Sequence, residues 1–172
     1  MKLKKADVCD FEKLKYFYTD AVNRSENTAV FSRWIYGKHP TDDMIKNYIK
    51  NGAMYFWEEN GRIFSAVAVT DQSSDYHGAD WSVEFADNKV AVVHILCVSP
   101  DCRGRGIGRR TMQAVLELGK TLGKKAVRLD ALFCNAPAHR LYESIGFCKK
   151  GSVRWHTENT GIAEFYLYEL LL

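Results

Sequence analysis

The stretch that decides the fold is residues 90–122, which read VAVVHILCVSPDCRGRGIGRRTMQAVLELGKTL. Residues 90–98 are rich in β-branched side chains and almost continuously apolar, which predicts a strand buried on both faces. Pro100 ends this strand, because proline has no amide proton for a ladder. Apolar residues then recur at helical spacing from Ile107 to Leu122, so an amphipathic helix follows after a short turn.

The turn between this strand and the helix has the features of an anion-binding site. It holds three glycines and four arginines, namely Gly104, Gly106, Gly108, Arg103, Arg105, Arg109 and Arg110. The first amides of a helix have no partner inside the helix and point beyond its N-terminal end. Glycines let a phosphate approach that backbone, and arginines add positive charge. We therefore expect a phosphate-bearing cofactor or substrate at this turn.

The spacing of the glycines distinguishes between phosphate-binding motifs. A P-loop would end in Gly-Lys-Ser/Thr, which is missing here. A dinucleotide-binding motif would need glycine or alanine where Arg109 stands, although Asp130 lies near the spacing of its ribose-binding acid. A third arrangement, Arg103-x-x-Gly106-x-Gly108, is present in full.

Composition predicts one ordinary globular domain. The chain has 172 residues, of which 47% are hydrophobic and 26% charged, as in typical soluble domains. A net charge of +3 is too small to indicate nucleic-acid binding by itself. No apolar run reaches membrane-spanning length, and residues 1–5 lack the apolar core of a signal peptide. Five cysteines without a Cys-x-x-Cys pair favour reduced thiols and a cytoplasmic location.

Hydrophobic periodicity predicts further elements on both sides of the central unit. Helices are expected after the capping residues Asp7, Thr41 and Asn135. Strands are expected at residues 2–6, 53–57, 63–70, 125–132, 147–155 and 162–171. The element order is thus β-α-α-β-β-β-α-β-α-β-β, with strands 90–98 and 125–132 parallel because a helix connects them.

Two polar segments interrupt these elements. The segment 23–40 carries aromatic residues that either fill a small core beneath the loop or grip a substrate, and both interpretations stay open. The segment 71–89 contains Trp81, Val83 and Phe85 in alternation, which indicates an extra strand or a long hairpin arm over the site.

A second motif follows the strand at 125–132. It reads Asn135-x-x-Ala138-x-x-Leu141-Tyr142-Glu143-x-x-Gly146-Phe147. Together with the arginine and glycine motif, in this order and spacing, it resembles the GCN5-related N-acetyltransferase (GNAT) superfamily over residues 3–170. The resemblance implies a single α/β domain over residues 1–172 with the GNAT fold. That fold is a mixed, mostly antiparallel central sheet with a splayed parallel strand pair and flanking helices.

The resemblance also implies acetyl-CoA as cosubstrate. The pantetheine arm would lie between the two splayed strands and pair with the backbone near Leu96 and Val98, and Asn135 would reach it. The pyrophosphate would lie on the turn. The cofactor-binding residues expected there are Arg103, Gly104, Arg105, Gly106, Ile107, Gly108 and Arg109.

Catalytic roles are assigned from the same likeness and from side-chain chemistry. Tyr142 matches the residue that protonates the departing thiolate, and an ordinary phenol carries that proton at neutral pH. His94 is the first candidate for the base that deprotonates the amine, and Glu84 is the second. A metal site is not expected, because His94 and Cys97 face opposite sides of a strand and no ligand spacing fits.

The sequence is compatible with several classes of acceptor. A small amine predicts a closed acidic and aromatic pocket built from residues 31–39, Trp81 and Glu84, with Trp34 and Tyr36 contacting the substrate. A peptide or protein amine predicts an open groove. A non-catalytic module that binds CoA, phosphate or RNA is the alternative from another class, although the basic stripe lacks the aromatic platform of RNA-binding domains. A homodimer is left open.

Overall fold

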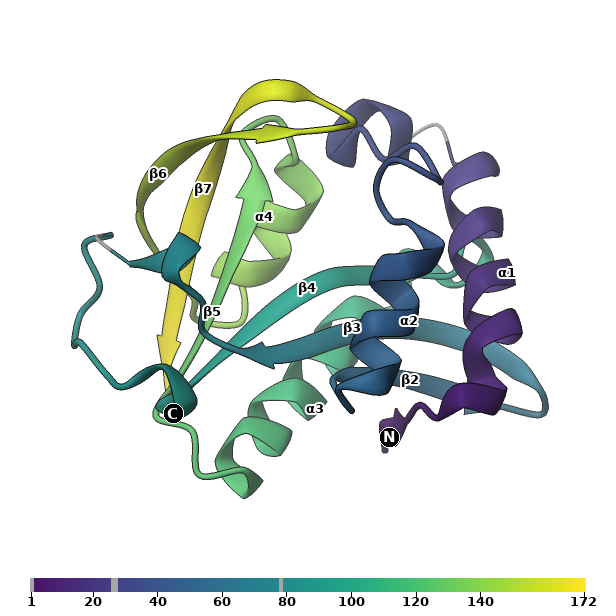
Figure 1. Cartoon of the computed structure of the whole chain (residues 1–172), viewed down its shortest axis with the longest axis horizontal. Helices are drawn as coiled ribbons and strands as arrows, with labels where there is room; N and C mark the ends of the chain where they lie inside the picture. The colour runs from purple at the N-terminus through teal and green to yellow at the C-terminus, as the bar shows by residue number, and fades with distance from the viewer. Residues whose placement is uncertain (1, 26–27, 78) are drawn as a thin grey trace.

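The computed structural model describes residues 2–25, 28–77 and 79–172. Its centre is one seven-stranded sheet with the strand order β1-β2-β3-β4-β5-β7-β6 (Figure 1). All neighbouring strands are antiparallel except β4 and β5, which are parallel. This architecture confirms the predicted fold class and the order of the main elements.

The strands are β1 (Lys4–Lys5), β2 (Met54–Glu59), β3 (Arg62–Asp71), β4 (Val90–Val98), β5 (Ala126–Leu132), β6 (Cys148–Thr157) and β7 (Gly161–Leu171). The helices are α1 (Phe11–Asn23), α2 (Asp42–Lys50), α3 (Ile107–Thr121) and α4 (Ala136–Glu143). Single turns of other helix types are η1 (Val8–Asp10), η2 (Thr28–Ser32), η3 (Ser74–Tyr76), η4 (Asp87–Lys89) and η5 (Pro100–Cys102).

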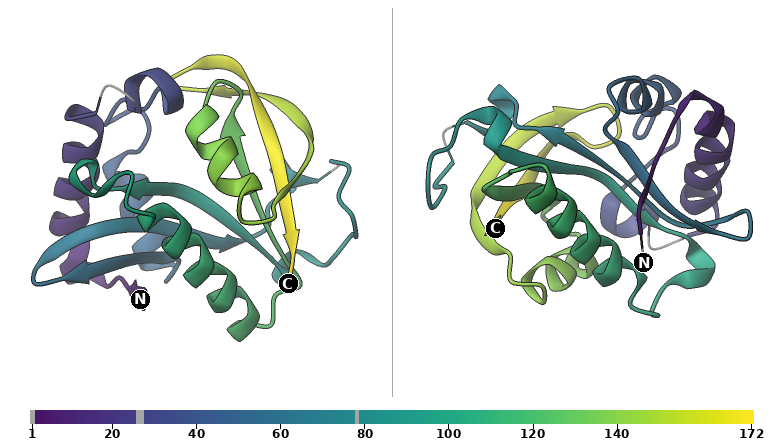
Figure 2. Two further views of the ribbon diagram at one scale, coloured as in Figure 1. Left: turned by 180° about the vertical axis from the view of Figure 1, so that it is seen from behind. Right: turned by 90° about the horizontal axis from the view of Figure 1, so that it is seen from below.

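The sheet is covered by helices on both faces. Helices α1 and α2 lie on one face and α3 and α4 on the other, as the views of Figure 2 show. The alternation of strand residues produces this arrangement. On β2, for example, Phe56 belongs to the core under α1 and α2, and Tyr55 belongs to the core under α3 and α4.

The first expected helix begins later than predicted. Asp7 caps the single turn η1, with its Oδ1 accepting a 2.8 Å hydrogen bond from the Cys9 amide. Asp10 bonds back to the Asp7 amide at 3.1 Å, which completes a capping box. Helix α1 therefore starts at Phe11, and the expected strand at residues 2–6 shortens to Lys4–Lys5.

The feature that creates a site is the divergence of β4 from β5. Their parallel pairing runs only as far as the Val93–Leu129 pair. Immediately beyond, Ile95 has a φ of 44°, and the register of β4 against β3 shifts, which marks a bulge. The Tyr18 hydroxyl donates a 2.9 Å hydrogen bond to the Ile95 carbonyl and so supports the bulge from helix α1. A positive φ at a β-branched residue is strained, and such strain persists only where surrounding contacts impose it.

The segment between β3 and β4 differs from its prediction. Its described residues form the turns η3 and η4 and no strand. A fully buried ion pair holds the segment on the sheet, with Arg128 Nη2 lying 3.1 Å from Glu169 Oε1. The same guanidinium donates to the Val83 carbonyl at 2.8 Å, and Glu169 accepts from the Ser82 amide at 3.0 Å. The centre of the Trp81 ring lies 4.1 Å from the guanidinium carbon of Arg128. This tryptophan therefore helps to hold the segment against the sheet.

No helix in the described residues is both long and apolar enough to cross a membrane. Within the same residues, no cluster of three or more histidine, cysteine, aspartate or glutamate side chains could hold a metal ion.

Candidate active site

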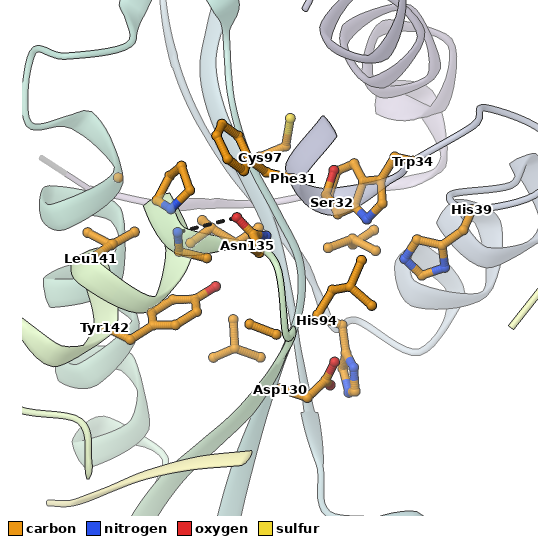
Figure 3. A pocket seen from close by; sticks show the side chains of 18 of the residues that line it. Phe31, Ser32, Trp34, His39, His94, Cys97, Asp130, Asn135, Leu141 and Tyr142 are labelled. Carbon is orange, nitrogen blue, oxygen red and sulfur yellow. Dashed lines mark hydrogen bonds between the residues drawn. The ribbon is translucent and has the colours of Figure 1, made fainter. Parts of the chain in front are cut away.

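A cavity of about 1010 Å³ lies where β4 and β5 diverge (Figure 3). The strands β4 and β5 form its middle, and the turn before α3 together with α4 forms one end. The other end is lined by residues of the segment between α1 and α2, of α2, of η3 and of the hairpin of β6 and β7. One continuous space therefore connects the predicted anion site with the end of the cavity around Asp130, which we call the second chamber.

The glycine turn has the geometry expected of an anion site. Gly104 and Gly106 have φ values of 73° and 72°, which favour glycine, and Gly106 is the N-cap residue of α3. Gly108 has a packing role, because a Cβ there would lie 3.2 Å from Leu141 Cδ2 on α4. The residues of this turn that line the cavity are Arg103, Gly104, Gly106, Ile107, Gly108 and Arg109. Arg105 is exposed and does not line it.

The predicted pantetheine contacts lie along the middle of the cavity. Leu96 and Val98 line it from β4, beyond the last pair with β5. Asn135 lines it from the start of α4 and accepts a 3.3 Å hydrogen bond from the Ala138 amide, drawn as a dashed line in Figure 3. Backbone groups freed by the splay are able to pair with an extended ligand. The residues present therefore fit the arm of a CoA thioester.

Tyr142 lies on α4 with its ring largely buried and its hydroxyl directed into the cavity (Figure 3). Burial raises the pKa of this phenol above its ordinary value, and the nearby Asp130 carboxylate adds to the effect. Tyr142 is therefore protonated at neutral pH and able to donate a proton inside the cavity.

His94 lines the cavity from β4, but its environment disfavours the charged form. Its Nε2 lies 3.0 Å from the Thr70 hydroxyl, and its ring stacks on Tyr48 with centroids 5.8 Å apart. Burial lowers the pKa of His94 to about 4. The ring is neutral at physiological pH, and as a base it is weak, because its conjugate acid gives up its proton so readily.

Asp130 also lines the cavity, although the sequence did not indicate it as a catalytic candidate. It lies on β5 just beyond the splay and lines the cavity beside His94 (Figure 3). The Tyr76 hydroxyl, carried by η3, donates a hydrogen bond to its Oδ1. Burial raises the pKa of the Asp130 carboxyl, although the Tyr76 bond opposes this shift. The only signal in the sequence is a single acid within the apolar strand 126–132. In the structure this acid is the first residue of β5 after the last pair with β4, at Leu129.

Other predicted site residues have different positions. Glu84 is exposed and does not line the cavity, which leaves it without contact to a reacting group. Trp81 packs on Arg128, and its Nε1 donates a 2.7 Å bond to the Tyr76 carbonyl. Tyr36 also lies outside the lining, with its hydroxyl bonded at 2.7 Å to Asp42 Oδ1. Trp34 does line the cavity, as expected.

A splayed parallel strand pair beside a glycine-capped helix is the arrangement that the resemblance to the acetyltransferases implied. The chain belongs to the acetyltransferase (GNAT) family. The model of the acetyltransferase (GNAT) family matches residues 18–147, which is most of the chain. This match confirms the family and the enzyme class that the two motifs predicted.

Two similar proteins are also named as N-acetyltransferases. An uncharacterized N-acetyltransferase of Methanocaldococcus jannaschii is 33% identical over 75 residues, which cover 44% of this chain and 33% of that protein. The match thus spans about a third of that relative's length. An uncharacterized N-acetyltransferase of Archaeoglobus fulgidus is 26% identical over 84% of this chain and 90% of its own length.

A solved structure shows the same fold over the whole chain. The structure of a Salmonella typhimurium protein with its cofactor acetyl-CoA has a TM-score of 0.72 and 19% identity. The alignment covers 100% of this chain and 94% of that one.

Proposed function

We propose that the chain transfers an acetyl group from acetyl-CoA to the primary amine of a small molecule, by direct attack within a ternary complex. The observation that carries this proposal is the continuity of the cavity from the glycine turn to the chamber around Asp130. Direct transfer requires that both substrates occupy one space and meet at the reacting carbon. The Salmonella structure, which holds acetyl-CoA in the same fold, supports the identity of the donor.

The chain's own groups account for each step of the chemistry. Asp130, whose pKa is raised by burial, accepts a proton from the bound ammonium and leaves a neutral amine to attack. A backbone amide of residues 96–98 stabilises the charge that develops on the acetyl oxygen, which is typically worth about 3 kcal/mol. As the carbon–sulfur bond breaks, Tyr142 donates its proton to the sulfur of CoA. The second proton of the amine, lost from the new amide nitrogen, then restores the Tyr142 phenol.

A covalent route through a cysteine is disfavoured by the surroundings of the thiols. Cys97 and Cys102 line the cavity, but both are buried. Burial raises the pKa of the Cys97 thiol to about 12. Because the thiolate is the nucleophilic form, this residue is inert at neutral pH. Direct attack by the amine needs no such group.

Contacts across the top of the second chamber favour a small acceptor over a peptide. The hairpin of β6 and β7 reaches the segment between α1 and α2 (Figure 1), where Asn159 Nδ2 donates a 2.9 Å bond to the Arg33 carbonyl. The Arg33 guanidinium lies 5.7 Å from the Phe133 ring, and the Cys134 thiol donates to the Phe31 carbonyl at 3.5 Å. An extended peptide could cross the chamber only if these contacts were broken.

The test is a thiol-release assay with acetyl-CoA and three acceptor types: small primary amines, a short peptide with a free α-amine, and an N-acetylated peptide containing lysine. We expect turnover of small amines and little of either peptide. Faster acetylation of a peptide would overturn the assignment of a small acceptor. Tight binding of acetyl-CoA with no turnover of any amine would instead identify a non-catalytic CoA-binding module.

A further inference from the structure

We propose that the acceptor is a primary amine with a flat, apolar body and no carboxylate, the chemistry of an arylalkylamine. This inference rests on the proposed function and specifies its substrate class. It follows from three properties of the second chamber: a wall of rings, one enclosed carboxylate, and the positions of the cationic side chains.

The wall of rings is formed by five side chains that come from five different elements. Tyr48 stacks on His94 at 5.8 Å, and the His94 ring meets the Tyr76 ring edge-on at 6.3 Å. Tyr76 lies 5.7 Å from Trp155, which lies 5.5 Å from Phe165. All five line the cavity. Such surfaces favour a flat apolar body, which buries area against ring faces with little loss of conformational freedom.

The enclosed carboxylate is Asp130, which lies within this wall. The Tyr76 ring is part of the wall, and its hydroxyl donates to the Asp130 carboxylate. An ammonium group placed beside Asp130 would neutralise a carboxylate that burial otherwise disfavours. It would also lie against aromatic faces, which attract a cation. Asp75, which is exposed on η3 and also lines the cavity, adds negative charge to the same side.

The cationic side chains lie at the other end of the cavity. Among the described lining residues, the only arginines are Arg103 and Arg109 of the glycine turn, and no lysine contributes. Burial lowers the pKa of both His39 and His94, in the latter case to about 4, so these rings carry no charge at neutral pH. The remaining lining histidine, His156, is exposed.

An amino-acid acceptor would therefore be rejected. Its carboxylate, two bonds from the amine, would be held near Asp130 with no cation to pair with. A carboxylate held beside a second carboxylate is repelled by it, and sites reject substrates whose polar groups cannot be matched. The chamber therefore discriminates against amino acids, because no lysine or arginine among its described lining side chains would pair with their carboxylate.

The experiment compares phenethylamine, L-phenylalanine and spermidine as acceptors in the thiol-release assay. Phenethylamine and phenylalanine differ only by the carboxylate, and spermidine is a cation without a flat body. We expect kcat/KM for phenethylamine to exceed that for phenylalanine by at least about 100-fold and to exceed that for spermidine clearly. Equal or faster acetylation of phenylalanine, or a preference for spermidine, would overturn the inference and leave the proposed function intact.

A binding measurement decides the matter without turnover. We expect calorimetry on the CoA-saturated protein to detect phenethylammonium binding and no binding of phenylalanine. Asp130→Asn should weaken phenethylammonium at least about 10-fold, since a charge-assisted contact is lost. Glu84→Gln, which removes an exposed carboxylate outside the cavity, should leave the affinity unchanged. Binding of phenylalanine as tight as that of phenethylamine, or an unchanged affinity in a folded Asp130→Asn variant, would refute the substrate class. Absence of turnover alone would refute only the proposed function.

Discussion

Substitution of Gly106 tests where the pyrophosphate of CoA binds. Gly106 is the N-cap residue of α3, with a φ of 72°, and a Cβ built there would meet no atom within 4 Å. A side chain at this position is therefore strained but not obstructed. The left-handed conformation costs most residues about 1–2 kcal/mol, and aspartate and asparagine tolerate it best. Gly106→Asp and Gly106→Asn should both fold.

The magnitude follows from the difference in charge between these two variants. Their side chains have nearly the same shape, and the strain is nearly the same, so the comparison isolates electrostatics. One carboxylate about 5 Å from one phosphate charge, at an effective dielectric constant near 20, costs about 3 kcal/mol. This corresponds to roughly a 100-fold loss of affinity for CoA, and the second phosphate charge adds to it.

The assay is calorimetry with two ligands. We expect Gly106→Asp to bind CoA about 100-fold more weakly than Gly106→Asn, with a smaller difference at high salt. Acetyl-pantetheine, which lacks the pyrophosphate, should bind both variants equally. The same CoA affinity in two folded variants would refute the placement of the pyrophosphate at this turn.

The remaining predictions concern protons and the buried ion pair. Tyr142→Phe should keep the ring packing and KM for acetyl-CoA while lowering kcat by about 10²-fold or somewhat less, because a thiolate leaves more readily than most groups; an unchanged kcat where chemistry limits turnover would return Tyr142 to a structural role. Because burial raises the pKa of Asp130, kcat/KM should fall as the pH drops through that raised pKa. Asp130→Asn should remove this limb from the pH profile. His94→Gln should preserve the limb, since burial lowers the pKa of His94 to about 4, and a limb lost only in His94→Gln would reverse the assignment of the base. Arg128→Met should destabilise the fold by about 3–5 kcal/mol, because Glu169 is left buried without its partner; a melting temperature equal to that of the wild type would show that the pair is dispensable.

The central unit of the fold could be predicted from sequence because its signals are local. Strand β4, the glycine turn and helix α3 follow from apolar runs, Pro100 and the helical spacing after Ile107. The Asn135 cap is equally local, and the structure confirms its bond to the Ala138 amide. The position of the glycine turn at one end of the cavity was predictable for the same reason.

The chamber around Asp130 could not be predicted, because it depends on contacts between distant segments. Trp81 resembles a substrate-gripping residue in sequence, but Arg128, far along the chain, binds its ring. Asp130 becomes a site residue only because β4 leaves β5 after Val93 and because η3 brings the Tyr76 hydroxyl to its carboxylate. Periodicity within one segment contains no information on either event.

The measurement that tests the central claim most directly is mass spectrometry of both the protein and the products. The chain is incubated with acetyl-CoA, first without an amine and then with phenethylamine. We predict that the intact protein mass stays unchanged without the amine. With the amine, one N-acetylated product should form for each CoA thiol released. An acetyl group covalently attached to the protein before the amine is added would contradict direct attack, and CoA release without the acetylated amine would contradict the transfer itself.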